Sequence, residues 1–256
     1  MFSDISIESL IILIILCFLA SFVDAIAGGG GLISLPAYIS AGFPIHLVMG
    51  THKFSATLST LGSSVGFFRH GKLNFNILKY LVPFHLIGAC LGVYILNKIN
   101  ENFLEPIIIF LLILILIYTI FNKEIGLKNN FTKTTLKSTI LGSMASFILG
   151  FYIGFFGPGG GSFLLFAFIK IYGMDFILSS GNAKILNLVS NLSSLIMFIY
   201  YGKVNYIYGF TVGFFMFLGG QLGTKFAIKK GSKLIKPFFI VVTTITLLKI
   251  IIEKFF

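Results

Sequence analysis

The stretch Ala27-Gly28-Gly29-Gly30-Gly31 decides the organisation of the chain, because a similar stretch recurs in the other half as Gly157-Pro158-Gly159-Gly160-Gly161-Ser162. Placing Gly28 on Gly159 shifts the halves by 131 residues (159 minus 28). Without a gap, this shift also aligns Gly42 with Gly173, Gly50 with Gly181, Lys53 with Lys184, Gly71-Lys72-x-Asn74 with Gly202-Lys203-x-Asn205, and Leu91-Gly92 with Leu222-Gly223. Matching lysines and a matching turn exceed what a low-complexity sequence gives by chance. The sequence therefore predicts a tandem duplication.

The composition places both halves in a membrane. The 256 residues are 57% hydrophobic and 11% charged, and the mean hydropathy is +1.01. One soluble core cannot bury so much apolar surface, so we predict an all-α integral membrane protein. The net charge of +11 would suggest nucleic acid in a soluble protein, but the lysines collect in short connections between apolar runs. That distribution is the positive-inside pattern, and we expect no nucleic-acid partner.

Apolar runs near the length of a bilayer crossing follow one another along the chain. A helix rises about 1.5 Å per residue, so about 20 residues cross the hydrocarbon core. The runs are residues 10–27, 45–68, 77–96, 104–121, 136–156, 176–201, 206–227 and 234–252. The lead before the first run is acidic, with Asp4 and Glu8, whereas a signal peptide begins with basic residues. We therefore expect the first run to be a retained helix.

Each glycine string is followed by an apolar run that is too short to cross a bilayer. Residues 32–41 and 163–172 have the same length, and Gly42 and Gly173 end them. Such a run covers only about half of the hydrocarbon core. The sequence predicts discontinuous helices beside the glycine strings, one in each repeat.

Loop charges predict how the repeats are related, because short loops rich in Lys and Arg stay in the cytoplasm. The connection after residue 68 carries Arg69, Lys72 and Lys79, whereas its counterpart in the second half has Lys203 alone. The next pair of connections shows the reverse, with a nearly neutral loop at residues 97–105 and a lysine-rich one at 225–236. Equivalent loops on opposite sides indicate an inverted repeat, which needs an odd number of crossings per half.

The odd count leads us to expect that each half-helix passes through the membrane and does not return as a re-entrant hairpin. This gives about 8 to 10 crossing segments. We divide the chain into a first transmembrane repeat at residues 1–121, a basic cytoplasmic linker at 122–136, and a second transmembrane repeat at 137–256.

The glycine strings are candidates for an anion site. A string that ends where a helix begins leaves several backbone N–H groups near one spot, and helix N-termini attract anions. Two such strings facing each other would surround a small anion with Gly28, Gly29, Gly30, Gly31, Gly159, Gly160, Gly161 and Ser162. The alternative is that the glycines only allow helices to pack closely.

Two lysines inside apolar runs strengthen the anion interpretation. Lys53 and Lys184 occupy the same position of the repeat, and an ionisable residue at membrane depth is a functional candidate. The alternative is that each lysine snorkels from a helix end to the membrane surface. Thr51 and Asn182 are neighbouring hydrogen-bond donors for the same anion.

Asp24 and His52 are candidates for a proton coupled to transport, because they are titratable and lie near the strings. In the ungapped alignment, Phe155 and Ala183 stand at the equivalent positions. Asp24 is at least as well suited to a structural role as a partnered carboxylate.

The motifs of enzymes and metal sites are incomplete. The second glycine string lacks the Gly-Lys-Ser/Thr ending of a phosphate-binding loop and the Gly-x-Ser-x-Gly frame of a serine hydrolase. His46, His70 and His85 are too scattered for a metal site, and Cys17 and Cys90 lie in apolar runs. We expect no enzyme activity, no cofactor, no metal and no disulfide framework.

The two glycine strings, Pro36 a few residues after the first, and the two Gly-Lys-x-Asn turns resemble the TauE/SafE family of sulfite exporters and related permeases. The resemblance runs from about residue 10 to residue 252. It implies passage of small sulfur-containing oxyanions, such as sulfite or organosulfonates, across the inner membrane. The second half departs from the pattern, since Ala167 stands opposite Pro36.

We therefore expect a multi-pass protein of the cell (inner) membrane that moves a small anion by alternating access, as a secondary transporter. The alternatives are a channel-like anion permease and a structural membrane protein without transport. The expected partners are the anionic substrate and the lipid bilayer, and a homodimer is a further option.

Overall fold

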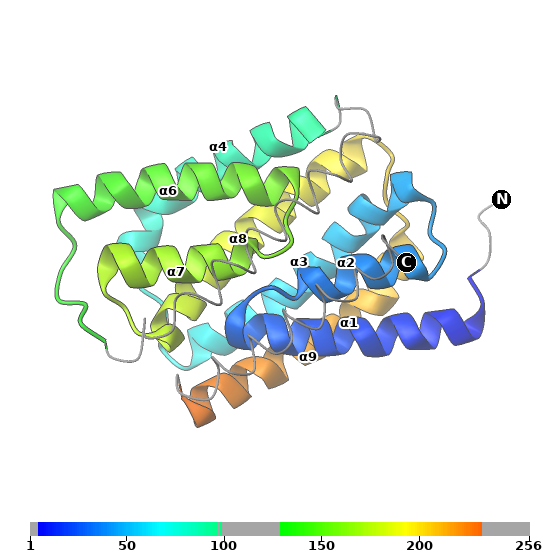
Figure 1. The fold of residues 1–256 in the computed structure, drawn as a ribbon, viewed down its shortest axis with the longest axis horizontal. Coiled ribbons are helices and arrows are strands. Elements are labelled where there is room, and N and C mark those ends of the chain that lie inside the picture. Colours follow the sequence, from blue (N-terminus) through cyan, green and yellow to red (C-terminus); the bar gives the residue numbers. More distant parts are fainter. Residues whose placement is uncertain (1–4, 97, 99–128, 232–256) are drawn as a thin grey trace, which may run out of the picture.

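The computed structural model describes residues 5–96, 98 and 129–231, and every element in these ranges is a helix. The first half contains α1 (Ile7–Ala27), α2 (Gly31–Ser40), α3 (Ile45–Arg69) and α4 (Phe75–Leu96). The second contains α6 (Leu136–Phe155), α7 (Gly160–Tyr172), α8 (Phe176–Tyr200) and α9 (Tyr206–Lys230) (Figure 1). The expected spans at 104–121 and 234–252, and residues 122–128 of the linker, lie outside the described residues.

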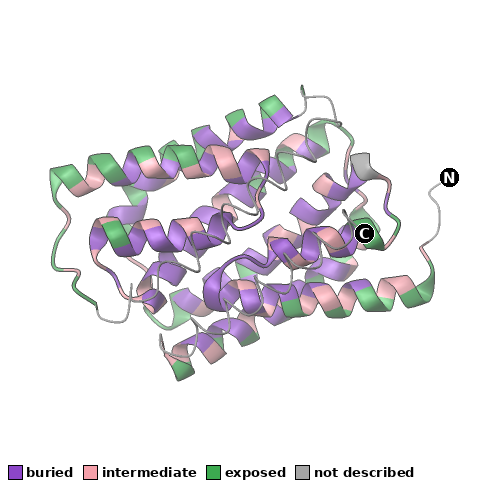
Figure 2. Ribbon diagram, viewed as in Figure 1, coloured by how far each residue is buried: buried purple, intermediate pink, exposed green. Residues whose placement is uncertain are grey.

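The described helices have the lengths and composition of a membrane protein. Helices α1, α4, α6 and α8 are long and apolar enough to cross a bilayer, while α2 and α7 are short and apolar. Helices α3 and α9 have 25 residues each, but their sequences are less apolar. Large apolar side chains such as Ile12, Phe84 and Phe210 are exposed on the outside, while serine and threonine side chains are buried (Figure 2). An apolar exterior around a polar interior suits a protein whose solvent is lipid.

Short polar side chains fix where several helices begin. Thr135 and Ser138 form a capping box at the start of α6, and Asp175 accepts the Leu178 N–H at 2.8 Å at the start of α8. Such caps satisfy N–H groups that have no partner within the helix. Glycine marks a helix end in the same way: α7 ends at Gly173, whose φ of 69° is a left-handed conformation that favours glycine.

Each half begins with a helical hairpin whose tip is the glycine string. Leu13 and Cys17 on α1 share a core cluster with Leu35 and Tyr38 on α2, so the two helices run antiparallel. In the second half, Gly142 near the start of α6 packs against the Tyr172 hydroxyl at the end of α7. Helices α6 and α7 therefore form the same kind of hairpin.

Helices α3 and α8, which follow the two hairpins, run antiparallel to each other. The Asn205 N–H, just after α8, donates to Thr51 Oγ1 near the start of α3 at 3.0 Å. Correspondingly, the Asn74 N–H, just after α3, donates to Asn182 Oδ1 near the start of α8 at 2.8 Å. The start of each helix therefore lies at the end of the other (Figure 1).

The hairpins consequently enter from opposite ends of the described structure, and their glycine tips meet in its centre. This arrangement corrects the expectation that each half-helix passes straight through. Helices α2 and α7 instead return from the centre to the end at which α1 and α6 begin. An odd number of crossings remains available, since α3, α4 and the run at 104–121 would supply three in the first half.

The last described helix of each half packs on the first helix of the other half. A β-carbon on Gly88 of α4 would meet the Phe147 carbonyl of α6, and one on Gly219 of α9 would meet the Phe18 carbonyl of α1. Small residues of this kind let helix backbones approach closely.

These contacts also correct the ungapped alignment. Gly88 and Gly219 keep the shift of 131, whereas their partners Phe147 and Phe18 are only 129 residues apart (147 minus 18). The second half therefore holds two extra residues around its glycine string. With this gap the position equivalent to Asp24 is Ile153, and not Phe155.

Candidate functional site: a polar cavity between the glycine hairpins

A small polar cavity of about 50 Å³ lies where the two hairpin tips meet α3 and α8. Backbone lines much of its wall, through Gly29, Gly30, Gly31, Gly157, Gly159 and Gly161. The polar and charged side chains on the wall are those of Ser21, Asp24, Ser34, His52, Lys53, Ser59, Thr60, Asn187 and Asn191. A single water needs about 10–15 Å³ of such space, so the cavity has room for a few waters or for one small oxyanion.

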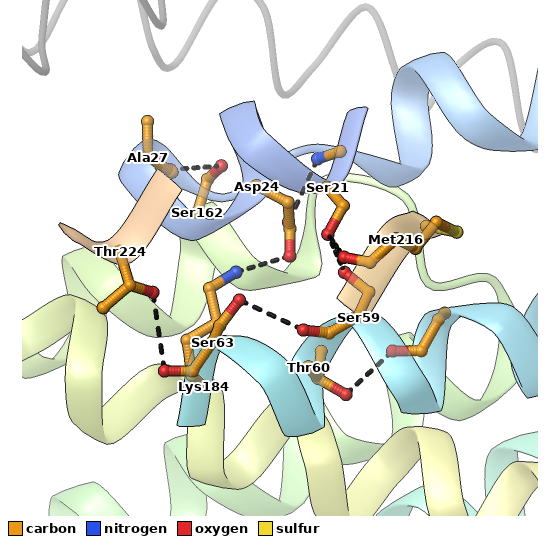
Figure 3. A network of polar contacts seen from close by, with 12 residues as sticks. Ser21, Asp24, Ala27, Ser59, Thr60, Ser63, Ser162, Lys184, Met216 and Thr224 are labelled. Carbon is orange, nitrogen blue, oxygen red and sulfur yellow. Dashed lines mark hydrogen bonds and ion pairs between the residues drawn. The ribbon is translucent and has the colours of Figure 1, made fainter. Parts of the chain in front are cut away.

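The glycines divide into those that pack and those that line the cavity. A β-carbon on Gly28 would lie 2.6 Å from the Ser162 N atom, and one on Gly31 would lie 3.1 Å from Pro158 Cα. The two strings therefore cross in contact, and the Ser162 hydroxyl adds a hydrogen bond of 3.3 Å to the Ala27 carbonyl (Figure 3). Gly160 faces the Ile153 side chain. The same strings therefore both pack closely and line the cavity, and Gly31 does both.

Asp24 sits in the last turn of α1 and ties the first hairpin tip to α8. One carboxylate oxygen accepts the Gly30 N–H at 3.0 Å, and the other lies 2.5 Å from Lys184 Nζ (Figure 3). The Lys184 side chain is 2% exposed and that of Asp24 is 16% exposed. Asp24 thus has the charged partner that the structural alternative required, and it also lines the cavity.

Lys53 occupies the equivalent place on α3, and its hydrogen-bond partners among the described residues are neutral groups. Its Nζ donates to the Ile153 carbonyl at 2.8 Å and to Asn191 Oδ1 at 3.4 Å. The side chain is 2% exposed, so it is enclosed by protein and does not snorkel to the surface. Because Ile153 replaces Asp24 in the gapped alignment, a backbone carbonyl takes the place of the carboxylate.

His52 is held beside the first hairpin. Its Nε2 lies 2.8 Å from the Ser34 hydroxyl of α2, and its ring meets the Tyr38 ring edge-on at 5.8 Å between centroids. Both His52 and Ser34 line the cavity.

Thr51 and Asn182 lie away from the cavity. Their side-chain oxygens accept the backbone N–H groups of Asn205 and Asn74, so they anchor the Gly-Lys-x-Asn turns of the opposite half. These hydrogen bonds explain why both turns and both partner positions recur in the sequence.

Ser21, Ser59 and Thr60 line the cavity although the sequence analysis did not single them out. The Ser21 hydroxyl lies 2.5 Å from the Ser59 hydroxyl and 2.5 Å from the Met216 carbonyl, which joins α1, α3 and α9 (Figure 3). For Ser59 the available signal was the spacing of Thr51, Ser55, Ser59 and Ser63, which recur every four residues and share one face of α3.

The fold and the cavity define a class of protein: an all-helical, multi-pass membrane protein with a charged, buried site where the glycine tips of two helical hairpins meet. Ion and substrate sites of secondary transporters have this construction.

Comparison with known proteins agrees with this class. A family model described as Sulfite exporter TauE/SafE matches residues 13–250. The chain therefore belongs to the TauE/SafE family, which is a family of membrane transporters and not of enzymes, and it is a multi-pass protein of the cell membrane.

Several curated relatives match over nearly their full length. The chain is 33% identical to a protein of Haemophilus influenzae named "Probable membrane transporter protein", over 98% of each chain. It is 33% identical to "Probable membrane transporter protein ORF9" of a Sinorhizobium species, over 94% of this chain and 91% of the relative. It is 30% identical to "Probable membrane transporter protein YfcA" of Escherichia coli, over 95% and 90% respectively. No solved structure matches the chain.

Proposed function

We propose that the protein is a secondary transporter that carries a small sulfur-containing oxyanion, such as sulfite or an organosulfonate, across the cell membrane. The observation that carries the proposal is Lys53, a buried ammonium group on the wall of a polar cavity whose partners are a carbonyl and an amide oxygen. Burying a charge is costly unless an opposite charge accompanies it. A bound anion would supply that charge.

The surrounding groups suit an oxyanion. Asn187 and Asn191 bring amide groups to the wall, and the starts of α2 and α7 bring backbone N–H groups. Helix N-termini carry partial positive charge, which adds to the attraction. The assignment of the glycine strings and Lys53 to substrate binding is part of the proposal. The sulfur-containing substrate class comes from the family's description.

We propose alternating access around this cavity by two inverted repeats, at residues 1–121 and 137–256, joined by the linker at 122–136. The antiparallel course of α3 and α8, the exchanged hydrogen bonds of the two turns, and the entry of the hairpins from opposite ends support this relation. In such transporters one repeat rocks against the other around a fixed site. The two hairpins, one from each end, are the natural inner and outer barriers.

Transport of labelled anions by proteoliposomes tests the function. Uptake and efflux of sulfite, thiosulfate, sulfate and an organosulfonate would be followed with and without a pH gradient. A carrier gives a saturable flux that responds to a gradient of a coupled ion or counter-substrate. A non-saturating flux would favour the channel-like permease, and no flux of any of these anions would contradict the proposal.

A further inference from the structure

The charges on the cavity wall are unequal, although the two lysines are equivalent in the sequence. At the cavity, Asp24 and Lys184 form an ion pair, which is neutral as a unit. Lys53 has no carboxylate within ion-pair distance among the described residues. Only one of the two lysines is therefore available to balance a bound anion.

The other titratable group on the wall does not change this balance. His52 is buried next to Lys53 and joined to the Ser34 hydroxyl through Nε2. A second buried cation beside Lys53 would be strongly unfavourable, so the imidazole is counted as neutral. With Lys53 protonated, the wall formed by Asp24, His52 and Lys53, together with Lys184 behind Asp24, carries a net charge of about one positive unit.

We propose that the cavity is specific for a singly charged oxyanion, held against Lys53, and that Asp24 sets this specificity by neutralising Lys184. The inference rests on the proposed transport function and narrows its substrate class. A monoanion such as a sulfonate leaves the occupied site neutral. A dianion leaves one negative charge buried next to the Asp24 carboxylate, which opposes its binding.

Neutralising Asp24 would change the charge of the anion that the cavity prefers, because Lys184 would lose its counter-charge. Its ammonium group lies behind Asp24, 2.5 Å from the carboxylate. An amide at position 24 would still accept the Gly30 N–H through its carbonyl oxygen, so the hairpin tip would keep that tie. Lys184 would then add a second positive charge to the wall.

The test compares methanesulfonate with sulfate, two tetrahedral anions of similar size that carry one and two negative charges. Their dissociation constants would be measured by calorimetry on the purified full-length protein in detergent at neutral pH. We expect methanesulfonate to bind the wild type at least about tenfold more tightly, which corresponds to about 1.4 kcal/mol. In Asp24→Asn, sulfate should gain at least about tenfold relative to methanesulfonate.

Asp175→Asn is the matched control, because it also replaces one carboxylate by an amide, but at the start of α8, where the side chain caps the Leu178 N–H. It should keep the wild-type preference. Equal or tighter binding of sulfate by the wild type would overturn the inference, even if Asp24→Asn failed to fold. An unchanged preference in a folded Asp24→Asn protein would overturn the role of Asp24. If neither anion bound the wild type, the inference would fail, and the flux assay with all four anions would decide the proposed transport function separately. Saturable transport with a preference for sulfate would overturn the inference and leave that function standing.

Discussion

Lys53 and Lys184 occupy equivalent positions of the repeat but have different neighbours. Their neighbours, more than their shared position, determine what each lysine does in the site. Lys184 is paired with a carboxylate, and Lys53 is held by a carbonyl and an amide. Removing one partner of a buried ion pair leaves an uncompensated charge, whereas removing a lone cation relieves one. The two residues should therefore respond differently to the same substitution.

For Lys53→Gln we expect a raised apparent KM for the transported anion with a near-normal protein level. Coulomb's law assigns about 4 kcal/mol to a charge pair at 4 Å with an effective dielectric of 20, and relief of desolvation offsets part of it. Lys53→Arg keeps the charge with another geometry and should retain partial function. The measurement is initial flux against anion concentration in proteoliposomes.

Lys170→Gln serves as the control for Lys53→Gln, since Lys170 is an exposed lysine on α7. It should behave as the wild type. A wild-type concentration dependence in Lys53→Gln would remove this residue from the substrate site.

For Lys184→Gln we expect a loss of stability, because Asp24 keeps its buried surroundings without its cation. Breaking a buried pair costs about 3–5 kcal/mol, and the partial exposure of Asp24 places the effect at or below the lower end. The thermal unfolding midpoint in detergent measures it. A midpoint equal to that of Lys53→Gln would show that the ion pair contributes nothing to stability.

Gly28→Ala tests the contact between the two strings. Gly28 has φ of 78°, and an added β-carbon would lie 2.6 Å from the Ser162 N atom and 2.7 Å from the Gly161 carbonyl carbon. We expect a large loss of folded protein. Gly42→Ala is the control, because Gly42 has a similar φ of 84° but none of the described residues lies within 4 Å of an added β-carbon. Comparing the folded yield of the two variants separates crowding from backbone strain, and equal yields would argue against a tight crossing.

At the scale of the helices, one buried histidine joins three of them. His85 on α4 has Nδ1 2.8 Å from the Ser146 carbonyl of α6 and Nε2 2.6 Å from the Ser190 hydroxyl of α8. Since a carbonyl can only accept, Nδ1 carries the proton and Nε2 accepts from Ser190. His85 carries no recognisable motif in the sequence, because its role in packing depends on helices from both halves.

His85→Leu should destabilise the protein by about 1–3 kcal/mol, because the Ser146 carbonyl and the Ser190 hydroxyl would lose a buried partner. His70→Leu is the control, since His70 is exposed at the end of α3 and bonds only to its own helix, at the Gly66 carbonyl. Thermal unfolding in detergent compares the two. Equal midpoints would show that the tie between α4, α6 and α8 is replaceable by apolar packing.

At the scale of the whole molecule, the two hairpins and the antiparallel pair α3 and α8 imply that equivalent turns face opposite sides of the membrane. Asn76 and Ile207 are equivalent, exposed positions in the first turns of α4 and α9. Single cysteines placed there, in a background without Cys17 and Cys90, should react with a membrane-impermeant thiol reagent from opposite sides. The loop charges predict that position 76 faces the cytoplasm. Labelling of both positions from the same side would contradict the inverted repeat.

The sequence by itself determined the class of the protein and the ingredients of the site. Its apolar composition required a membrane, and the matched glycines and lysines located the two strings and Lys53, which line part of the cavity. Such signals are readable because they depend on local spacing and on the period of a helix. Capping residues such as Asp175 likewise act within one turn of their own helix.

Only the tertiary structure decided how the two halves meet. The hairpin tips, the two extra residues around the second string, the anchoring roles of Thr51 and Asn182, and the pairing of Asp24 with Lys184 all depend on contacts between segments far apart in the chain. In an alignment of the two halves the lysines are equivalent, because an alignment matches sequence positions. It carries no information about which residues surround each lysine in space. Whether a buried lysine lies beside a carboxylate or a carbonyl is decided by the helix that packs against it, and here those helices belong to the opposite half.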